Sequence, residues 1–307
     1  MALSLIVFAG FYPPARRAIQ YADILAQALS GRLVLLNINR AALVDPYATV
    51  GQVYHQQELA RQADTAAILS QQAERLLSPA TVEVATDLLP AVAQNLAHRY
   101  QPALFVLSQA DDDRPAAVDL LTSCVEILRA GSYPLLIVPT RAPAPTENPP
   151  RRILIAADRE SFALAAEAAA LRPLLALPGV EVIVIHVTIG VDDDEGCALA
   201  LRAVQASGLV EGRAIPELRG YQHESYAQGV MAAVLDTRAD LVIVVARQRS
   251  YFGDLFHRSV TANLMENCPV PVLVLPTAAT EPATETPGLA TAASYANTVL
   301  TGLLPAS

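Results

Sequence analysis

The chain contains the same succession of segments twice. An apolar run opens each half, LSLIVFAG from Leu3 and RRILIAAD from Arg151, and an alanine-rich stretch of helical character follows each run. A second apolar run comes next, RLVLLNI or VEVIVIHV, and each half closes with YPLLIVPT or VPVLVLPT. Strands that are apolar throughout and alternate with helices are typical of a parallel sheet covered on both faces. The repeat therefore predicts an α/β fold.

The spacing of the two halves indicates a true duplication. Thr140 and Thr277 end them, which gives an offset of 277 − 140 = 137, and the same offset places Leu104 on Leu241 without a gap. Nearer the start the offset is 153 − 5 = 148, so the first half carries additional residues in its middle. A long helix is expected there, over QVYHQQELARQADTAAILSQQAERLL.

We expect two tandem doubly wound, Rossmann-like domains, each with a five-stranded, mostly parallel sheet and helices on both faces. Domain 1 spans residues 1–140, a proline-rich linker 141–150, domain 2 residues 151–277, and a low-complexity tail 278–307, whose last part could form a short docked helix. The stretches RRAIQYADILAQALSG and SFALAAEAAALRPLLALPG are each expected to form one helix that stops at a glycine. Ligands of such sheets bind beyond the carboxyl ends of the strands.

The composition excludes several functions. The formal net charge is -9, which argues against nucleic acid as a partner, and the chain contains arginine but no lysine. Without lysine the chain can contain neither a Walker-type phosphate loop nor a Schiff-base lysine. The 3 cysteines are widely spaced and indicate free thiols, not disulfides or a zinc motif. We find no apolar run of membrane-spanning length, and we expect a cytoplasmic protein.

In their order, these segments resemble the universal stress protein family in its tandem two-domain form. Members of that family that bind ATP carry an Asp after the first strand and a GxxGx9G[ST] pattern after the fourth. Glycines let the backbone approach phosphates closely, and the last pair presents helix N-terminal amides to them. In the second half Asp158 and Ser259 match this pattern, whereas its glycine positions hold Val245, Gln248 and Arg258.

The first half departs further from the family pattern. Gly10 stands in place of the Asp, Thr122 replaces the Ser, and the glycine positions hold Ser108, Asp111 and Leu121. The acidic run Asp111–Asp113 falls where a phosphate would lie, so charge repulsion adds to unsuitable geometry. We expect no nucleotide to bind in this half.

The second half has a basic loop in an acidic protein. Arginine side chains can hold phosphate or carboxylate without glycine amides, and a Ser can cap the helix that follows. We take as candidate nucleotide- or anion-binding residues Asp158, Val187, Arg247, Arg249, Arg258, Ser259 and Val260. Asp158 and the Val187 backbone would contact the base or ribose, and the arginines and Ser259 would hold phosphate. The alternative is that the arginines face solvent or pair with carboxylates such as Asp111–Asp113 or Glu266.

Three other patterns favour structural roles. Asp254, His257 and Ser259 are too close in sequence to suggest a hydrolase triad, and there is no GxSxG motif. The acidic residues at 192–195 are better explained as a solvated turn at a helix start than as a cation site. His186 ends an apolar strand, where a hydrogen-bonded structural histidine is the favoured interpretation.

These observations favour a stress-linked regulatory or ligand-sensing module and not a conventional enzyme. The candidate cofactor is ATP or another adenine nucleotide; slow nucleotide hydrolysis is the weakest hypothesis, because no general base or metal ligand set is apparent. The alternative function is a scaffold that binds no nucleotide and acts through protein contacts. The closing strands YPLLIVP and VPVLVLP are suited to edge pairing, so we expect the two halves to associate, and a homodimer is a further candidate.

Overall fold

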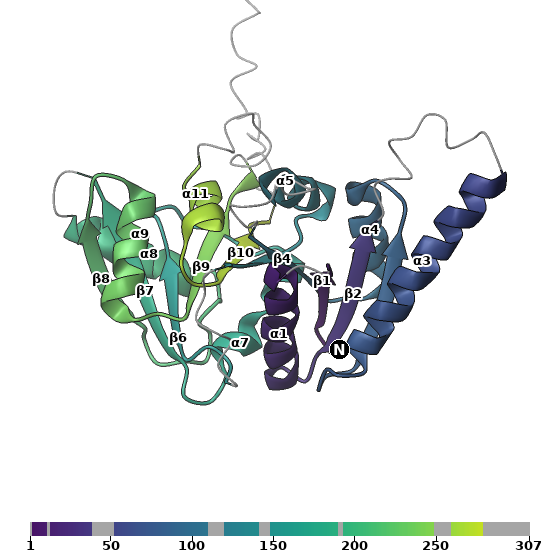
Figure 1. The fold of residues 1–307 in the computed structure, drawn as a ribbon. Helices are drawn as coiled ribbons and strands as arrows, with labels where there is room; N and C mark the ends of the chain where they lie inside the picture. The colour runs from purple at the N-terminus through teal and green to yellow at the C-terminus, as the bar shows by residue number, and fades with distance from the viewer. Residues whose placement is uncertain are drawn as a thin grey trace, which may run out of the picture.

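A computed structural model describes residues 2–10, 13–38, 52–109, 120–140, 148–189, 193–248 and 259–278, with only the backbone of 52–59. Two strand–helix series follow one another in the chain (Figure 1). The first contains β1 (Ser4–Phe8), α1 (Pro13–Ala28), β2 (Arg32–Ile38), α3 (Gln52–Ala73), β3 (Ala80–Ala85), α4 (Leu89–Arg99), β4 (Ala103–Ser108), α5 (Leu120–Gly131) and β5 (Leu135–Val138). The second contains β6 (Arg152–Ala156), α6 (Ala166–Ala169), α7 (Arg172–Leu175), β7 (Glu181–Thr188), α8 (Asp194–Ala206), β8 (Glu217–Gln222), α9 (Tyr226–Thr237), β9 (Leu241–Ala246), α11 (Val260–Asn267) and β10 (Val272–Pro276).

The described strands form one sheet in the order β3-β2-β1-β4-β5-β10-β9-β6-β7-β8. All pairings within each half are parallel, and β5 pairs with β10 in the antiparallel direction. The strand order reverses at β1 in the first half and at β6 in the second, as in a doubly wound fold. The α/β fold with tandem, mostly parallel five-stranded units is thus confirmed.

The strand register preserves the sequence repeat. Leu5 lies opposite Leu104 in the first half, and Ile153 lies opposite Leu241 in the second. These are the pairs that the two sequence offsets bring together, because 5 + 148 = 153 and 104 + 137 = 241. The duplication therefore extends from the order of the elements to the alignment of individual residues.

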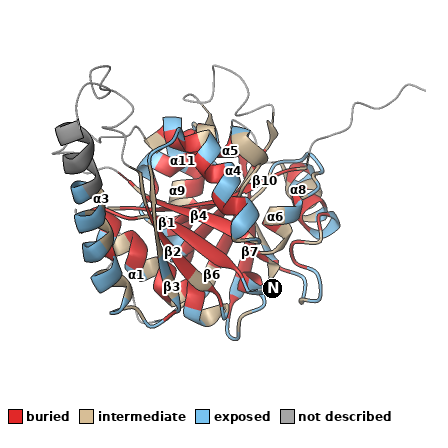
Figure 2. Cartoon of the chain, turned by 90° about the vertical axis from the view of Figure 1, so that its right-hand side faces the viewer, coloured by how far each residue is buried: buried red, intermediate tan, exposed pale blue. Residues whose placement is uncertain are grey.

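Helices cover both faces of the sheet. Side chains from α4, α5, α9 and α11 form one core cluster with the strands, and side chains from α1, α3, α6, α7 and α8 form the other. Each cluster contains residues of both halves, so the hydrophobic core is continuous across the β5–β10 junction. The central strands between the two helical layers are almost entirely buried, whereas the residues of the edge strands β3 and β8 are partly or fully exposed (Figure 2). No helix among the described residues is both long and apolar enough to cross a bilayer.

A buried side chain also joins the halves. The Gln109 amide nitrogen, directly after β4, donates a 2.8 Å hydrogen bond to the carbonyl oxygen of Met265 in α11. Gln109 is 9% exposed and Met265 is fully buried. Because a buried amide must find a partner, this contact fixes the distance between the end of β4 and α11.

One helix prediction is wrong. The stretch at 161–179 does not form a single helix; only the short segments α6 and α7 are helical. Leu164 forms an antiparallel bridge with Thr277, and the Ala165 amide donates to the Pro276 carbonyl oxygen, so the chain stays extended until Ala165. Pro173 then interrupts the helix, because proline has no N–H to donate to the preceding turn.

Candidate functional site

The connection after β6 crosses the carboxyl edge of the second half. It comprises residues 157–165 and is called the strap below; it begins at β6 and ends beside β10, with β9 between them in the sheet. At its start the Ala157 amide donates to the Ile185 carbonyl oxygen. At its end the Ala278 amide donates to the Ala163 carbonyl oxygen at 2.9 Å, beside the Leu164 bridge. Both ends of the strap are therefore fixed to the sheet.

Arg247, the first residue after β9, is bound to the middle of the strap. Its Nη2 donates to Oδ1 of Asp158 at 2.5 Å and its Nε to Oδ2 at 3.3 Å, so the contact with the carboxylate is bidentate. Nη2 and Nη1 also donate to the carbonyl oxygens of Glu160 and Ser161, at 2.8 and 3.1 Å. The Arg247 side chain is only 15% exposed, whereas that of Asp158 is 56% exposed. Two residues expected to contact one ligand thus contact each other.

A second polar cluster occupies the same edge at the end of β7. The His186 ring donates from Nδ1 to the Ala157 carbonyl oxygen at 3.0 Å, and its Nε2 lies 3.5 Å from Oδ2 of Asp193. Arg159 of the strap forms an ion pair with the same carboxylate. Asp193 also caps α8, because its Oδ1 accepts from the Gly196 amide at 2.8 Å. His186 is thus a hydrogen-bonded strand-end histidine, as the sequence predicted.

Gly196 allows this cluster to be compact. A Cβ at that position would lie 2.8 Å from Nε2 of His186 and closer still to the Asp193 carboxylate. Only glycine therefore lets the first turn of α8 approach the histidine so closely. The acidic turn at 192–195 was expected to be solvated, but Asp193 is partly buried and its carboxylate contacts two other side chains.

Val187 packs inward, against α9. It is 6% exposed, and its residue pair in the sheet is Tyr221 of β8. A Cβ added to Gly229 of α9 would lie 2.3 Å from Cγ1 of Val187, so the helix rests directly on this side chain. Because its side chain is buried in this way, Val187 could contact a ligand only through its backbone. The backbone is also the part of Val187 that was expected to contribute to the site.

Ser259 and Val260 lie at the start of α11. Ser259 is the N-cap, and its Oγ accepts from the Ala262 amide at 3.0 Å, as expected for a capping serine. Val260 is the first helical residue and is 38% exposed. The first-half counterpart differs, because Thr122 is the third residue of α5 and not a residue preceding the helix. Arg249, Arg258, Asp254, His257 and the acidic run 111–113 lie outside the described residues.

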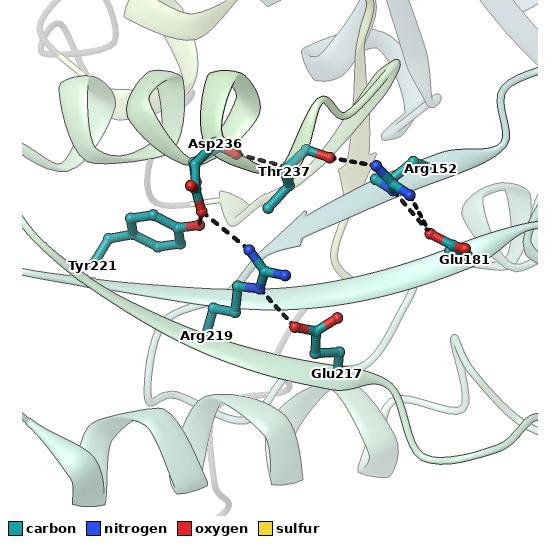
Figure 3. A network of polar contacts seen from close by, with 8 residues as sticks. Arg152, Glu181, Glu217, Arg219, Tyr221, Asp236 and Thr237 are labelled. Carbon is teal, nitrogen blue, oxygen red and sulfur yellow. Dashed lines mark hydrogen bonds and ion pairs between the residues drawn. The ribbon is translucent and has the colours of Figure 1, made fainter.

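The opposite edge of the second half carries a separate polar network (Figure 3). Arg219 of β8 donates to Glu217 at 2.6 Å and to Asp236 of α9 at 3.0 Å, and the Tyr221 hydroxyl donates to the same Asp236 carboxylate at 2.7 Å. Burial raises the pKa of the Tyr221 phenol, and its hydrogen bond to Asp236 raises it further. This network ties β8 to α9 and lies away from the strap.

A pocket of about 470 Å³ is formed by the end of α8 and the connection from α8 to β8. Its lining residues are Gln205, Ala206, Gly208, Val210, Glu211, Arg213, Ala214, Ile215 and Pro216. It contains none of the predicted site residues. Within the described residues we find no group of three His, Cys, Asp or Glu side chains that could hold a metal ion.

Residues 149–276 match the family model of the Universal stress protein family. The second half is a universal stress protein domain. No curated protein sequence matches the chain significantly.

Solved structures extend the likeness to the first half. A universal stress protein from Archaeoglobus fulgidus DSM 4304 superposes with a TM-score of 0.62 over 88% of this chain and 97% of its own, at 15% identity. A Pseudomonas aeruginosa UCBPP-PA14 protein, also described as a universal stress protein, gives 0.53 over 89% and 93%, at 14% identity. At such identities the likeness shows the fold alone, a doubly wound α/β arrangement that extends over both halves of the chain.

The ion pair at the strap was the part of the site that the sequence did not reveal. The carboxylate partners expected for the loop arginines were Asp111–Asp113 or Glu266. For Arg247 the partners are Asp158 and, 3.6 Å from Nε, the carboxylate of Glu160. The available signal was positional: Asp158 and Arg247 each follow a strand, and these strands are neighbours in a doubly wound sheet.

Proposed function

We propose that the protein is a regulatory, non-enzymatic module of the universal stress type that binds a small anionic ligand in its second domain. The ligand site is the carboxyl edge of β6 and β9, with Arg247 as the group that binds the anion. An adenine nucleotide is the first candidate, because Asp158 and Ser259 match the pattern of ATP-binding members of the family.

One observation carries this proposal. Arg247 places a largely buried guanidinium at the point where the strand order reverses, which is where ligands of doubly wound sheets bind. Two backbone carbonyl oxygens of the strap orient the guanidinium. An arginine held in this way loses little conformational entropy on binding, so it can hold a phosphate or carboxylate group without glycine amides.

The test is a ligand panel on the full chain. Mass spectrometry of protein purified without added nucleotide would reveal a retained ligand, and thermal shift with ATP, ADP, AMP and pyrophosphate would reveal an added one. A ligand that binds the folded state raises the unfolding midpoint. We expect a rise for the wild type and none for Arg247→Gln. Arg219→Gln is the matched control, because it removes an arginine from the separate network and should respond as the wild type does.

A scaffold function is the second candidate. The observation that favours it is the saturation of the site by the protein's own groups, since Asp158, Glu160 and Ser161 all accept hydrogen bonds from Arg247. A scaffold would act through protein contacts and would show no midpoint shift with any anion in the panel. The same experiment therefore separates the two functions.

A further inference from the structure

Both ends of the strap are anchored by groups other than Arg247. Ala157 accepts from the His186 ring and donates to the Ile185 carbonyl oxygen, while Ala163 and Ala165 are hydrogen-bonded to the chain around Pro276. Between these anchors the backbone is also held by the Arg247 hydrogen bonds to the Glu160 and Ser161 carbonyl oxygens, so it does not depend on the Asp158 carboxylate alone. The strap is thus a backbone segment that is held at both ends, and the Asp158 side chain can change its rotamer within it.

The contacts of Arg247 fall into two kinds. Those with the Glu160 and Ser161 carbonyl oxygens join it to the backbone of the strap. Those with Asp158 join it to a side chain that is 56% exposed and therefore close to water. Releasing the carboxylate leaves the guanidinium oriented by the carbonyl oxygens and exposes the Nε–Nη2 edge, which is the edge that binds planar anions in a bidentate manner.

From this arrangement we infer that Asp158 is an internal competitor for the anion site, and that its ion pair with Arg247 is an autoinhibitory latch on ligand binding. The inference rests on the proposed function and adds its regulation. A phosphate or carboxylate group of a ligand takes the place of the Asp158 carboxylate on Arg247, and Asp158 turns toward solvent. The role of Asp158 is then opposite to the ligand contact that its sequence position suggested.

Competition follows from the geometry and the charge. The same two N–H groups cannot serve two anions at once, and an unmoved Asp158 carboxylate would repel an incoming anion. The affinity measured for the ligand is therefore the intrinsic affinity reduced by the fraction of molecules in which the latch is open. A change that opens the latch strengthens binding without a new contact to the ligand.

Asp158→Asn tests the latch directly. The amide side chain has nearly the same shape and keeps an oxygen that can accept from the Glu160 amide, as Oδ1 of Asp158 does at 3.0 Å. It removes the charge that holds the guanidinium. Calorimetric titration of the full chain with ATP and with pyrophosphate at low ionic strength should give a dissociation constant about three- to tenfold lower than in the wild type.

Two matched controls separate competition from a general change of charge. Glu160→Gln removes a carboxylate that lies 3.6 Å from Nε of Arg247 but makes no bidentate contact with it. This substitution should lower the dissociation constant at most about twofold. Asp236→Asn makes the same chemical change in the network around Arg219 and should leave the affinity unchanged. Circular dichroism and the unfolding midpoint verify that each variant is folded.

The outcomes distinguish the latch from the proposed function. Binding to Asp158→Asn that is tighter than binding to both the wild type and Glu160→Gln supports the latch. If the wild type binds and Asp158→Asn binds equally or more weakly, the latch is overturned and the anion site stands, with Asp158 as a ligand contact or a bystander. If neither the wild type nor Asp158→Asn binds any of the anions, the proposed function itself fails.

Discussion

Leu136 of β5 lies opposite Leu273 of β10, at the centre of the antiparallel pairing that joins the two halves. The two residues are equivalents in the repeat, since 273 − 136 = 137. On either side, Leu135 pairs with Val274 and Ile137 with Val272. Leu135 thus pairs with the repeat equivalent of Ile137, and Ile137 pairs with the repeat equivalent of Leu135. The junction therefore has a local pseudo-two-fold axis, and it makes one sheet out of two.

Truncation at this junction should destabilise the whole chain. Leu273 is 1% exposed, and Leu273→Ala removes buried apolar atoms and leaves a cavity between the helical layers. We expect a loss of about 2–5 kcal/mol in the free energy of unfolding, measured by urea denaturation. Leu235→Ala, at a position of α9 that is 72% exposed, is the control and should change it by less than about 0.5 kcal/mol. Equal effects of the two substitutions would show that the junction is not packed as described.

The contact between α9 and β7 predicts a rescue. Gly229→Ala places a methyl group where Cγ1 of Val187 already lies, and we expect a loss of about 1–3 kcal/mol from the forced shift of the helix. Val187→Ala removes the opposing methyl groups, so the double variant should be more stable than the sum of the two single losses predicts. Urea denaturation of all four proteins forms a double-mutant cycle. Additive losses would contradict a direct contact.

Arg247 should also contribute to stability through the strap. Arg247→Gln removes hydrogen bonds from a side chain that is 15% exposed, and a loss of about 1–3 kcal/mol in the free energy of unfolding is expected. Arg219→Gln, whose side chain is 37% exposed, should cost less than Arg247→Gln, because ion pairs near the surface contribute little to stability. Hydrogen exchange of residues 157–165 should accelerate in the first variant only. A larger loss for Arg219→Gln would reverse the ranking and count against the anchoring role.

The cysteines should differ in reactivity. Burial raises the pKa of the Cys268 thiol to about 11 from its ordinary value of 9.0, and Cys124 is also buried. Alkylation at pH 8 followed by mass spectrometry should therefore modify Cys197, which is partly exposed, before either of the others. Rapid labelling of Cys268 in the folded protein would contradict its burial.

The raised pKa of Cys268 also has a thermodynamic consequence. Above pH 9 the thiol ionises in the unfolded chain while the folded protein still holds the proton. Ionisation therefore favours the unfolded state, and the free energy of unfolding should fall as pH rises from 9 toward 11. Cys268→Ala should flatten this dependence, and an equally steep fall in that variant would assign it to other groups.

The sequence predicted the fold because its signals were local and repeated. Apolar runs identified the strands, and the offsets placed Leu5 with Leu104 and Ile153 with Leu241, as the register confirms. The duplication supplied two independent observations of each element, which reduced the ambiguity of any single run.

The strap could not be predicted in the same way. Its alanine-rich residues favour a helix locally, whereas its extended course depends on Thr277 and its ion pair on Arg247, both far away in the sequence. Tertiary contacts of this kind override local propensity. The predicted site residues that the structure describes do lie at one edge of the sheet. The spacing of these residues in the sequence does not specify which charged side chains pair with one another.

Calorimetric titration of ATP into the wild type, Arg247→Gln and Arg219→Gln tests the central claim most directly. The account predicts measurable binding to the wild type and to Arg219→Gln at low ionic strength, and no binding to Arg247→Gln. Equal binding to all three proteins would place the ligand elsewhere, and no binding to any of them would contradict an anion site in the second domain.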